Sequence, residues 1–253
     1  MITVSSIPHS AQPPARRTGR VRIACLDVEW TDKLVKGGSR PFCYSIVWLD
    51  LPASASTDLG DVPFEFTSVY VADPGEQDTL VAAAAATLRT ATEHADLITG
   101  HQLCADLAVL ARKAPRPHPD LEQARAHWKA RRSPDAQVRY LDTRYDCDPL
   151  LQGHSRRLVD VCTELGLDVT QPELARTSMP AWHRRWLKDG NSEGRERISV
   201  LNLRHSLSTA YVAARHEGLA HWAPPLNVNE ALATGAKGAW DWLDHPTFTN
   251  LLE

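Results

Sequence analysis

The stretch RIACLDVE, residues 22–29, is an apolar run that ends in two carboxylates one residue apart. Side chains alternate faces along a strand, so Asp27 and Glu29 are expected to point to the same side. Two carboxylates about 7 Å apart at a strand end repel each other unless a cation lies between them. Mg²⁺ suits such a pair and fills its remaining positions with water and phosphate oxygens. The alternative is a strand that simply runs out into an acidic turn.

Composition places the chain in a broad class. Its 253 residues are 43% hydrophobic and 23% charged, which suits one soluble domain of generous size. The net charge is −3, so any anionic partner would have to be bound by local basic patches. Five scattered cysteines without a Cys-x-x-Cys pair favour a reducing compartment over a disulfide frame or a zinc site. With no signal peptide and no apolar stretch of membrane-spanning length, we expect a cytoplasmic protein.

The first third of the chain predicts strands. Residues 1–20 have no periodicity and are expected to form a disordered tail. A Gly-Gly turn at 37–38 and a loop rich in Pro, Ser and Asp separate three strand-like stretches. Short connections between successive strands favour an antiparallel meander. The three strands are expected at residues 22–29, 42–49 and 64–72.

Strands and helices then alternate, which predicts an α/β protein with a sheet of mixed direction. The stretch 168–196 is expected to be irregular, and a long helix is expected over 197–217. Residues 21–218 would form the main domain, and 219–253 a small helical C-terminal extension. The other expected elements are helices over 76–94, 104–113, 120–132 and 156–165 and strands over 96–99 and 139–145.

A second acidic position lies in the stretch TGHQLCADLAVL, residues 99–110. A strand is expected to end there, Gly100 permits a tight turn, and Asp106 falls in the first turn of an apolar helix. An acidic residue at that place also stabilises a helix through its dipole, which is the structural alternative.

The two acidic motifs in this order resemble those of the DEDD-type 3′–5′ exonucleases, which have the ribonuclease H-like fold. The resemblance covers about residues 22–217. That family's Leu-Asp-x-Glu motif is similar to residues 26–29, and its Gly-His-Asn-x-x-Phe-Asp motif to residues 100–106, with Gln102 for Asn and Ala105 for Phe. Residues 141–143 resemble the family's Asp-Thr strand, and residues 154–167 resemble the Leu…Leu-Gly helix that follows it.

The third motif departs from the family pattern, which is a helix carrying His-x-x-x-x-Asp or Tyr-x-x-x-Asp. In the stretch LRHSLSTA, residues 203–210, Arg204 stands at the His position and Thr209 at the Asp position. A neutral hydroxyl cannot replace a carboxylate as a Mg²⁺ ligand without loss of charge. Helical spacing places Asn202, His205 and Thr209 on one face, with burial or capping as the alternative role for His205.

Other residues nearby could contribute to such a site. Four acids could replace the missing carboxylate, or simply be solvated charges: Asp142, Asp146, Asp148 and Asp160. Two basic groups could follow a phosphate backbone, or be solvated faces: Arg125, Lys129 and Arg132 on one helical face, and Arg184 and Arg185 after His183. Trp182 and Trp186 could stack on bases, although packing is the simpler reading.

The resemblance implies a metal-dependent 3′–5′ exonuclease acting on the 3′ end of single-stranded DNA or RNA. Mg²⁺ or Mn²⁺ would be held by Asp27, Glu29 and Asp106, and His205 would be the general base. The competing hypothesis is a non-catalytic nucleic-acid-binding or scaffold protein that kept the fold and lost the fourth acid. The residues expected to contact the substrate are Trp30, His101, Gln102, Arg204 and Thr209.

Overall fold

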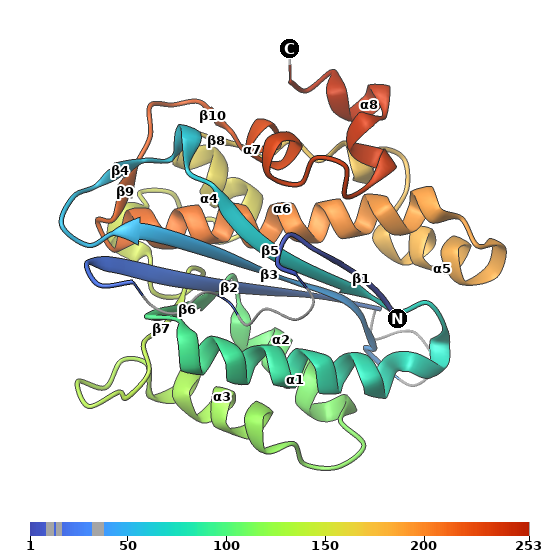
Figure 1. Cartoon of the computed structure of the whole chain (residues 1–253), viewed down its shortest axis with the longest axis horizontal. Coiled ribbons are helices and arrows are strands. Elements are labelled where there is room, and N and C mark those ends of the chain that lie inside the picture. Colours follow the sequence, from blue (N-terminus) through green and yellow to red (C-terminus); the bar gives the residue numbers. More distant parts are fainter. Residues whose placement is uncertain (9–12, 14–16, 32–37, 253) are drawn as a thin grey trace.

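The computed structural model describes residues 1–8, 13, 17–31 and 38–252. Their centre is a six-stranded sheet with the strand order β1-β5-β3-β2-β6-β7 (Figure 1). Strands β2, β3 and β5 form the predicted antiparallel meander, and β6 and β7 continue the sheet parallel to β2. The chain is therefore an α/β protein with a mixed sheet, as predicted. The bounds are β2 Arg20–Trp30, β3 Pro41–Pro52, β5 Phe64–Tyr70, β6 Leu97–Gly100 and β7 Tyr140–Asp142.

Helices cover both faces of this sheet (Figure 1). The long helix α6 lies on one face, and α1, α2 and α3 lie on the other. Alternation along β2 divides its side chains between two cores: Ile23 and Cys25 pack on the α6 side, and Leu26 and Val28 on the α1 side. Asp27 and Glu29 continue the first series and so face α6. The bounds are α1 Gln77–His94, α2 Leu103–Lys113, α3 Pro119–Ala130 and α6 Ser192–His216.

The prediction that residues 1–20 form a disordered tail is wrong for residues 2–5. They form the edge strand β1 (Ile2–Ser5), which pairs antiparallel with β5. The Ser5 hydroxyl also lies 2.8 Å from the hydroxyl of Thr67. Residues 9–12 and 14–16 of that tail, and Gly37 of the expected Gly-Gly turn, lie outside the described residues.

The expectation of irregular structure over 168–196 is also wrong in part. It contains the helix α5 (Met179–Asp189), which carries Pro180 in its first turn and ends at Gly190 in the left-handed conformation (φ 67°). Proline at the start and glycine just past the end are typical helix boundaries, so the sequence did hold a signal. Helix α6 then begins five residues earlier than expected, where the side chain of Asn191 accepts a hydrogen bond from the Gly194 amide.

The C-terminal extension packs over α6 on the side away from the sheet (Figure 1). Its buried side chains, including Trp242 and Phe248, belong to the same core as β2 and α6. All five cysteines are free. Among the described helices, none combines the length and apolarity needed to cross a bilayer. The remaining α-helices and strands of the described residues are α4 Leu158–Glu164, α7 Val228–Gly235, α8 Pro246–Thr249, β4 Thr57–Asp58, β8 Leu167–Asp168, β9 Ala220–His221 and β10 Leu226–Asn227.

Candidate metal centre

Asp27, Glu29 and His205 meet where the end of β2 faces α6. The Nδ1 atom of His205 lies 3.3 Å from Oε1 of Glu29 and 3.6 Å from Oδ2 of Asp27. One ligand atom from each of the three residues lies within 4.8 Å of the other two, so the group could hold a metal ion. The strand alternation that predicted a shared side for Asp27 and Glu29 brings both carboxylates to the same helix.

The sequence assigned no role to two further residues that contact this group. Asn202, one turn before His205 on α6, donates from Nδ2 to Oδ2 of Asp27 at 2.6 Å. The side-chain amide of Gln171 lies 2.9 Å from Nε2 of His205, on the far side of the ring. Helical spacing had placed Asn202 on the correct face, but no local pattern marks Gln171. Both hold a group of the centre in a fixed orientation.

Asp106 lies in the same acidic surroundings without joining the close group of three. Only 2% of the residue is exposed, and its Oδ2 atom has no hydrogen-bond partner among the described residues. Burial and repulsion from Asp27 and Glu29 raise the pKa of Asp106 well above its usual range. The structure thus brings His205, and not the predicted Asp106, within 4.8 Å of the two strand carboxylates.

The turn before Asp106 explains how α2 reaches this place. A Cβ atom at Gly100 would lie 2.8 Å from the carbonyl oxygen of Leu26 on β2, so the close approach of β6 and β2 needs glycine. Gln102 then takes the left-handed conformation (φ 62°), and its backbone N–H donates to Oδ1 of Asp142 at 2.9 Å. Together these features start α2 beside the carboxylates of β2.

The charges of the centre are strongly coupled. Burial raises the pKa of Glu29, and the hydrogen bond with His205 only partly offsets that effect. Burial by itself would lower the pKa of His205, but hydrogen bonds and attraction to Asp27 and Glu29 outweigh it and raise the pKa to about 10. Without a metal ion, His205 is therefore an imidazolium at neutral pH, with no lone pair to accept a proton from water.

This shift gives a pH dependence that can be measured in the presence of a chelator. Because the folded-state pKa of His205 is raised from 6.5 to about 10, its contribution to stability is complete below pH 6.5. We expect that contribution to be lost as the pH rises through about 10. Urea unfolding of the wild type and of His205→Asn, followed from pH 6 to 10.5, measures it as their difference. A constant difference between the two proteins would contradict the ion pair.

One predicted substrate contact is wrong. Arg204 is fully buried, and its guanidinium donates to both oxygens of Glu173 at 2.6 and 2.7 Å and to Oδ1 of Asn229 at 2.6 Å. Adjacent helix positions point about 100° apart, so Arg204 faces the C-terminal extension while His205 faces the sheet. A side chain so enclosed cannot reach a substrate.

The other expected substrate residues lie near the centre in different environments. His101 contacts the Thr143 hydroxyl at 3.0 Å through Nδ1 and the Arg156 carbonyl at 2.9 Å through Nε2, and burial lowers its pKa to about 4. Trp30 is half-buried, beside a bulge that interrupts the pairing of β2 with β3. Thr209 is 2% exposed, one turn beyond His205. Substrate contacts by His101, Gln102, Trp30 and Thr209 stay predictions.

The four acids that could have replaced the missing carboxylate have partners elsewhere. Asp142 accepts from the Gln102 and Arg144 amides and from the Trp128 indole. None of the four belongs to the group at β2 within the described part of the chain. The other three pairs are Asp146 with Arg131 and Arg132, Asp148 with Arg156, and Asp160 with Ser155.

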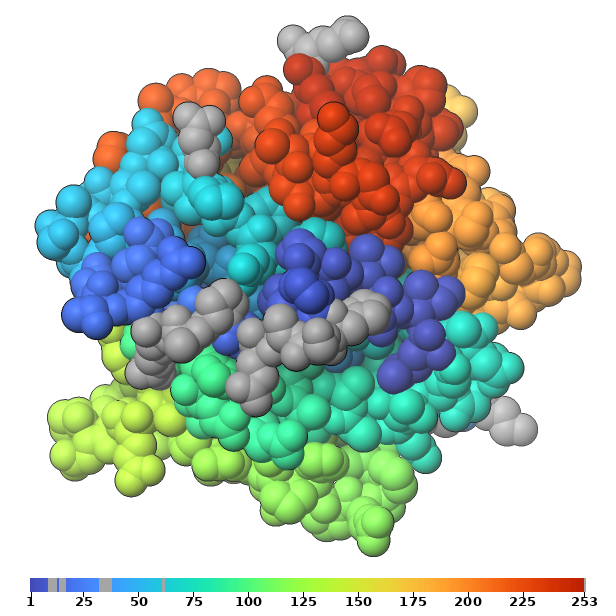
Figure 2. Space-filling model, viewed as in Figure 1, coloured from blue at the N-terminus to red at the C-terminus, as the bar shows by residue number. Residues whose placement is uncertain are grey.

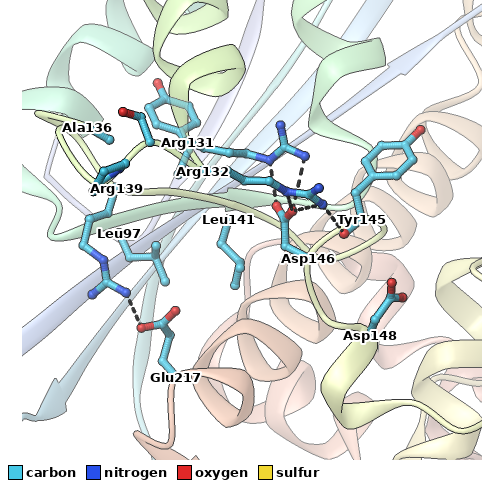
Figure 3. A pocket seen from close by; sticks show the side chains of 13 residues that line it. Leu97, Arg131, Arg132, Ala136, Arg139, Leu141, Tyr145, Asp146, Asp148 and Glu217 are labelled. Carbon is cyan, nitrogen blue, oxygen red and sulfur yellow. Dashed lines mark hydrogen bonds and ion pairs between the residues drawn. The ribbon is translucent and has the colours of Figure 1, made fainter.

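A hollow of about 660 Å³ lies at the β7 edge of the sheet, and its lining residues do not include Asp27, Glu29 or His205. Its arginines already pair with carboxylates: Arg131 and Arg132 with Asp146, and Arg139 with Glu217 (Figure 3). Arg132, which could have met a phosphate, thus shares the carboxylate of Asp146 with Arg131. This hollow is no open basic groove.

The tryptophans of α5 serve packing. The Trp182 indole is 8% exposed and donates to the Glu173 carbonyl at 3.2 Å. The Trp186 indole donates to the Val71 carbonyl at 3.0 Å and is half-buried. Both rings therefore join α5 to its neighbours, as the simpler reading held.

Fold and centre together define a broad class. The chain is an α/β protein whose mixed sheet carries, at the end of β2, two carboxylates and an imidazole that could hold a metal ion. No known family model matches the chain, and no curated protein matches it.

Proposed function

We propose that this protein is a metal-dependent 3′–5′ exonuclease of the ribonuclease H-like fold, acting on the 3′ end of single-stranded nucleic acid. The observation that carries the proposal is the convergence of the carboxylates of Asp27 and Glu29 at one strand end, with Asp106 buried close by. The antiparallel meander extended by two parallel strands also supports it, because the resemblance implies that order.

The residues present fit a divalent cation. Carboxylate oxygens are the ligands that Mg²⁺ and Mn²⁺ prefer. Oδ2 of Asp106 is buried without a hydrogen-bond partner among the described residues, and Oε1 of Glu29 has the 3.3 Å ion pair with His205 as its contact, an arrangement that is costly unless another group compensates these oxygens. Asp27 and Glu29 would hold the ion, with Asp106 in the first turn of α2. When bound, such an ion polarises the phosphate and lowers the pKa of a water molecule.

The chain's own residues prepare this site. The Asn202 amide fixes Oδ2 of Asp27, so the carboxylate keeps one orientation. Burial of Glu29 and Asp106 excludes bulk water, which strengthens their attraction for a cation. Because a threonine stands at the family's fourth acidic position, we expect a second ion to bind weakly and cleavage to be slow.

The direct test is cleavage of a labelled single strand. In the presence of Mg²⁺ or Mn²⁺, the full chain should release mononucleotides from the 3′ end. Asp27→Asn should abolish release, because it removes a charged ligand and leaves the fold in place. Asp189→Asn, at the exposed last residue of α5, is the matched control and should cleave like the wild type.

The competing function is a nucleic-acid-binding or scaffold module without catalysis. The position of His205 favours it to some extent, because its imidazolium already balances part of the negative charge at Asp27 and Glu29. Binding of the strand without release of mononucleotides, unchanged in Asp106→Asn, would support this alternative and contradict the exonuclease.

A further inference from the structure

We infer that His205 is a metal ligand and not the general base, and that the centre therefore selects first-row transition ions such as Mn²⁺ or Zn²⁺ over Mg²⁺. Gln171 is the residue that holds its ring in place. This rests on the proposed function, because it concerns the same centre. It goes further by assigning the chemical class of the ion and a different role to the imidazole.

Distances within the group suit a shared ion. Two ligand atoms each about 2.1 Å from one ion lie roughly 3.0–3.5 Å apart at angles of 90–110°. The His205 Nδ1 atom lies 3.3 and 3.6 Å from the two carboxylate oxygens. A charge-assisted hydrogen bond between an imidazolium and a carboxylate is usually about 2.7–2.9 Å long. The spacing is thus closer to that of co-ligands than to that of a tight ion pair.

The surroundings of the ring do not suit a general base. A base must reach the proton that it removes, directly or through one water molecule. The Nδ1 atom of His205 faces Asp27 and Glu29, and Nε2 faces the Gln171 amide. Both ring nitrogens are therefore directed at protein groups.

Gln171 completes the pattern of a ligating histidine. A metal-bound imidazole carries its remaining proton on the other nitrogen and donates it to an acceptor that fixes the ring. The side-chain Nε2 atom of Gln171 lies 2.9 Å from Nε2 of His205, and a flip of this amide would bring its carbonyl oxygen to the same place as the acceptor. Asn202 supports Asp27 as a donor, from Nδ2 to Oδ2 at 2.6 Å. His205 on α6 and Asp27 on β2 are thus each supported by a neighbouring amide side chain.

An independent observation points into the same place. Oδ2 of Asp106 is buried and has no hydrogen-bond partner among the described residues. A divalent ion at the centre would compensate part of the negative charge that Asp27, Glu29 and Asp106 can carry. Imidazole in the ligand set then favours transition ions, because Mg²⁺ takes oxygen ligands almost exclusively.

The test compares ion binding by the chelator-treated full chain. Titration with Mg²⁺, Mn²⁺ and Zn²⁺, followed by the melting temperature and by calorimetry, should show tighter binding of the two transition ions. His205→Asp should shift the preference to Mg²⁺, and Gln171→Leu should weaken Mn²⁺ binding about tenfold. His216→Gln, at the far end of α6, is the matched control and should bind like the wild type. Circular dichroism verifies folding, and His205→Gln replaces His205→Asp if the latter is unfolded.

A spectroscopic measurement separates ligand from base. Spin-echo modulation of bound Mn²⁺ should show a coordinated imidazole nitrogen in the wild type and none in His205→Asp or His205→Gln. Mn²⁺ bound without that nitrogen signal, with affinity unchanged in His205→Gln, would overturn the inference and leave the metal-dependent function intact. If no ion binds the wild type at all, the proposed function falls as well.

Discussion

Replacing Arg204 by Met is expected to lower the free energy of unfolding by about 3–5 kcal/mol, because it leaves the charge of Glu173 buried without its partner. Arg204 is 0% and Glu173 1% exposed, and two hydrogen bonds join their charged groups. Glu173 also accepts from the Trp242 indole at 3.1 Å, so the loss extends to the C-terminal extension. Urea unfolding measures the change.

The matched control is a double variant that removes both charges of the Arg204–Glu173 pair. Arg204→Met combined with Glu173→Gln keeps an acceptor for Trp242 and leaves no isolated charge. Replacing both members of a buried pair is often close to neutral, so the double variant should recover most of the lost stability. If the double variant is no more stable than the single one, the ion pair is not the cause. Lys188→Gln, which breaks the exposed pair with Asp189, should cost less than about 1 kcal/mol.

Asp106→Asn is expected to act in opposite directions on stability and on metal binding. In chelator, the variant should melt higher than the wild type, because it removes a buried charge repelled by Asp27 and Glu29. With Mn²⁺ present, the order should reverse, because the variant loses a carboxylate that favours the cation. The expected effect on cleavage is complete loss.

The direction of the pKa shift of Asp106 also determines the pH range in which the effect on stability is expected. A carboxyl whose pKa is raised in the folded state destabilises the protein only above its ordinary pKa. The gain in Asp106→Asn should therefore be absent near pH 3.5 and should grow with rising pH in chelator until the pH passes the raised pKa of Asp106. Asp120→Asn on α3 is a suitable control, since its carboxylate pairs with Arg89 at the surface. A lower melting temperature of Asp106→Asn in chelator would contradict a charge held under repulsion.

Local sequence determined the sheet and one side of the centre. Strand alternation requires Asp27 and Glu29 to share a face, and the apolar runs around them require burial, so both features could be read from residues 22–29 alone. The order of three successive strands followed by alternating strands and helices likewise predicted the mixed sheet. Gly100 predicted the turn that starts α2 beside β2.

Only the tertiary structure decided which side chains of α6 meet those carboxylates. Helical spacing predicted that Asn202, His205 and Thr209 share a face, whereas the alignment of motifs placed Arg204 and Thr209 at the family's His and Asp positions. Their positions are set by partners far away in sequence: Glu173 and Asn229 bind Arg204 on the other side of α6, and Gln171 contacts His205. One face of α6 can pack on the sheet because the C-terminal extension covers the opposite face. Such long-range pairing leaves no periodic signal in the chain, because it depends on which buried charges can satisfy one another.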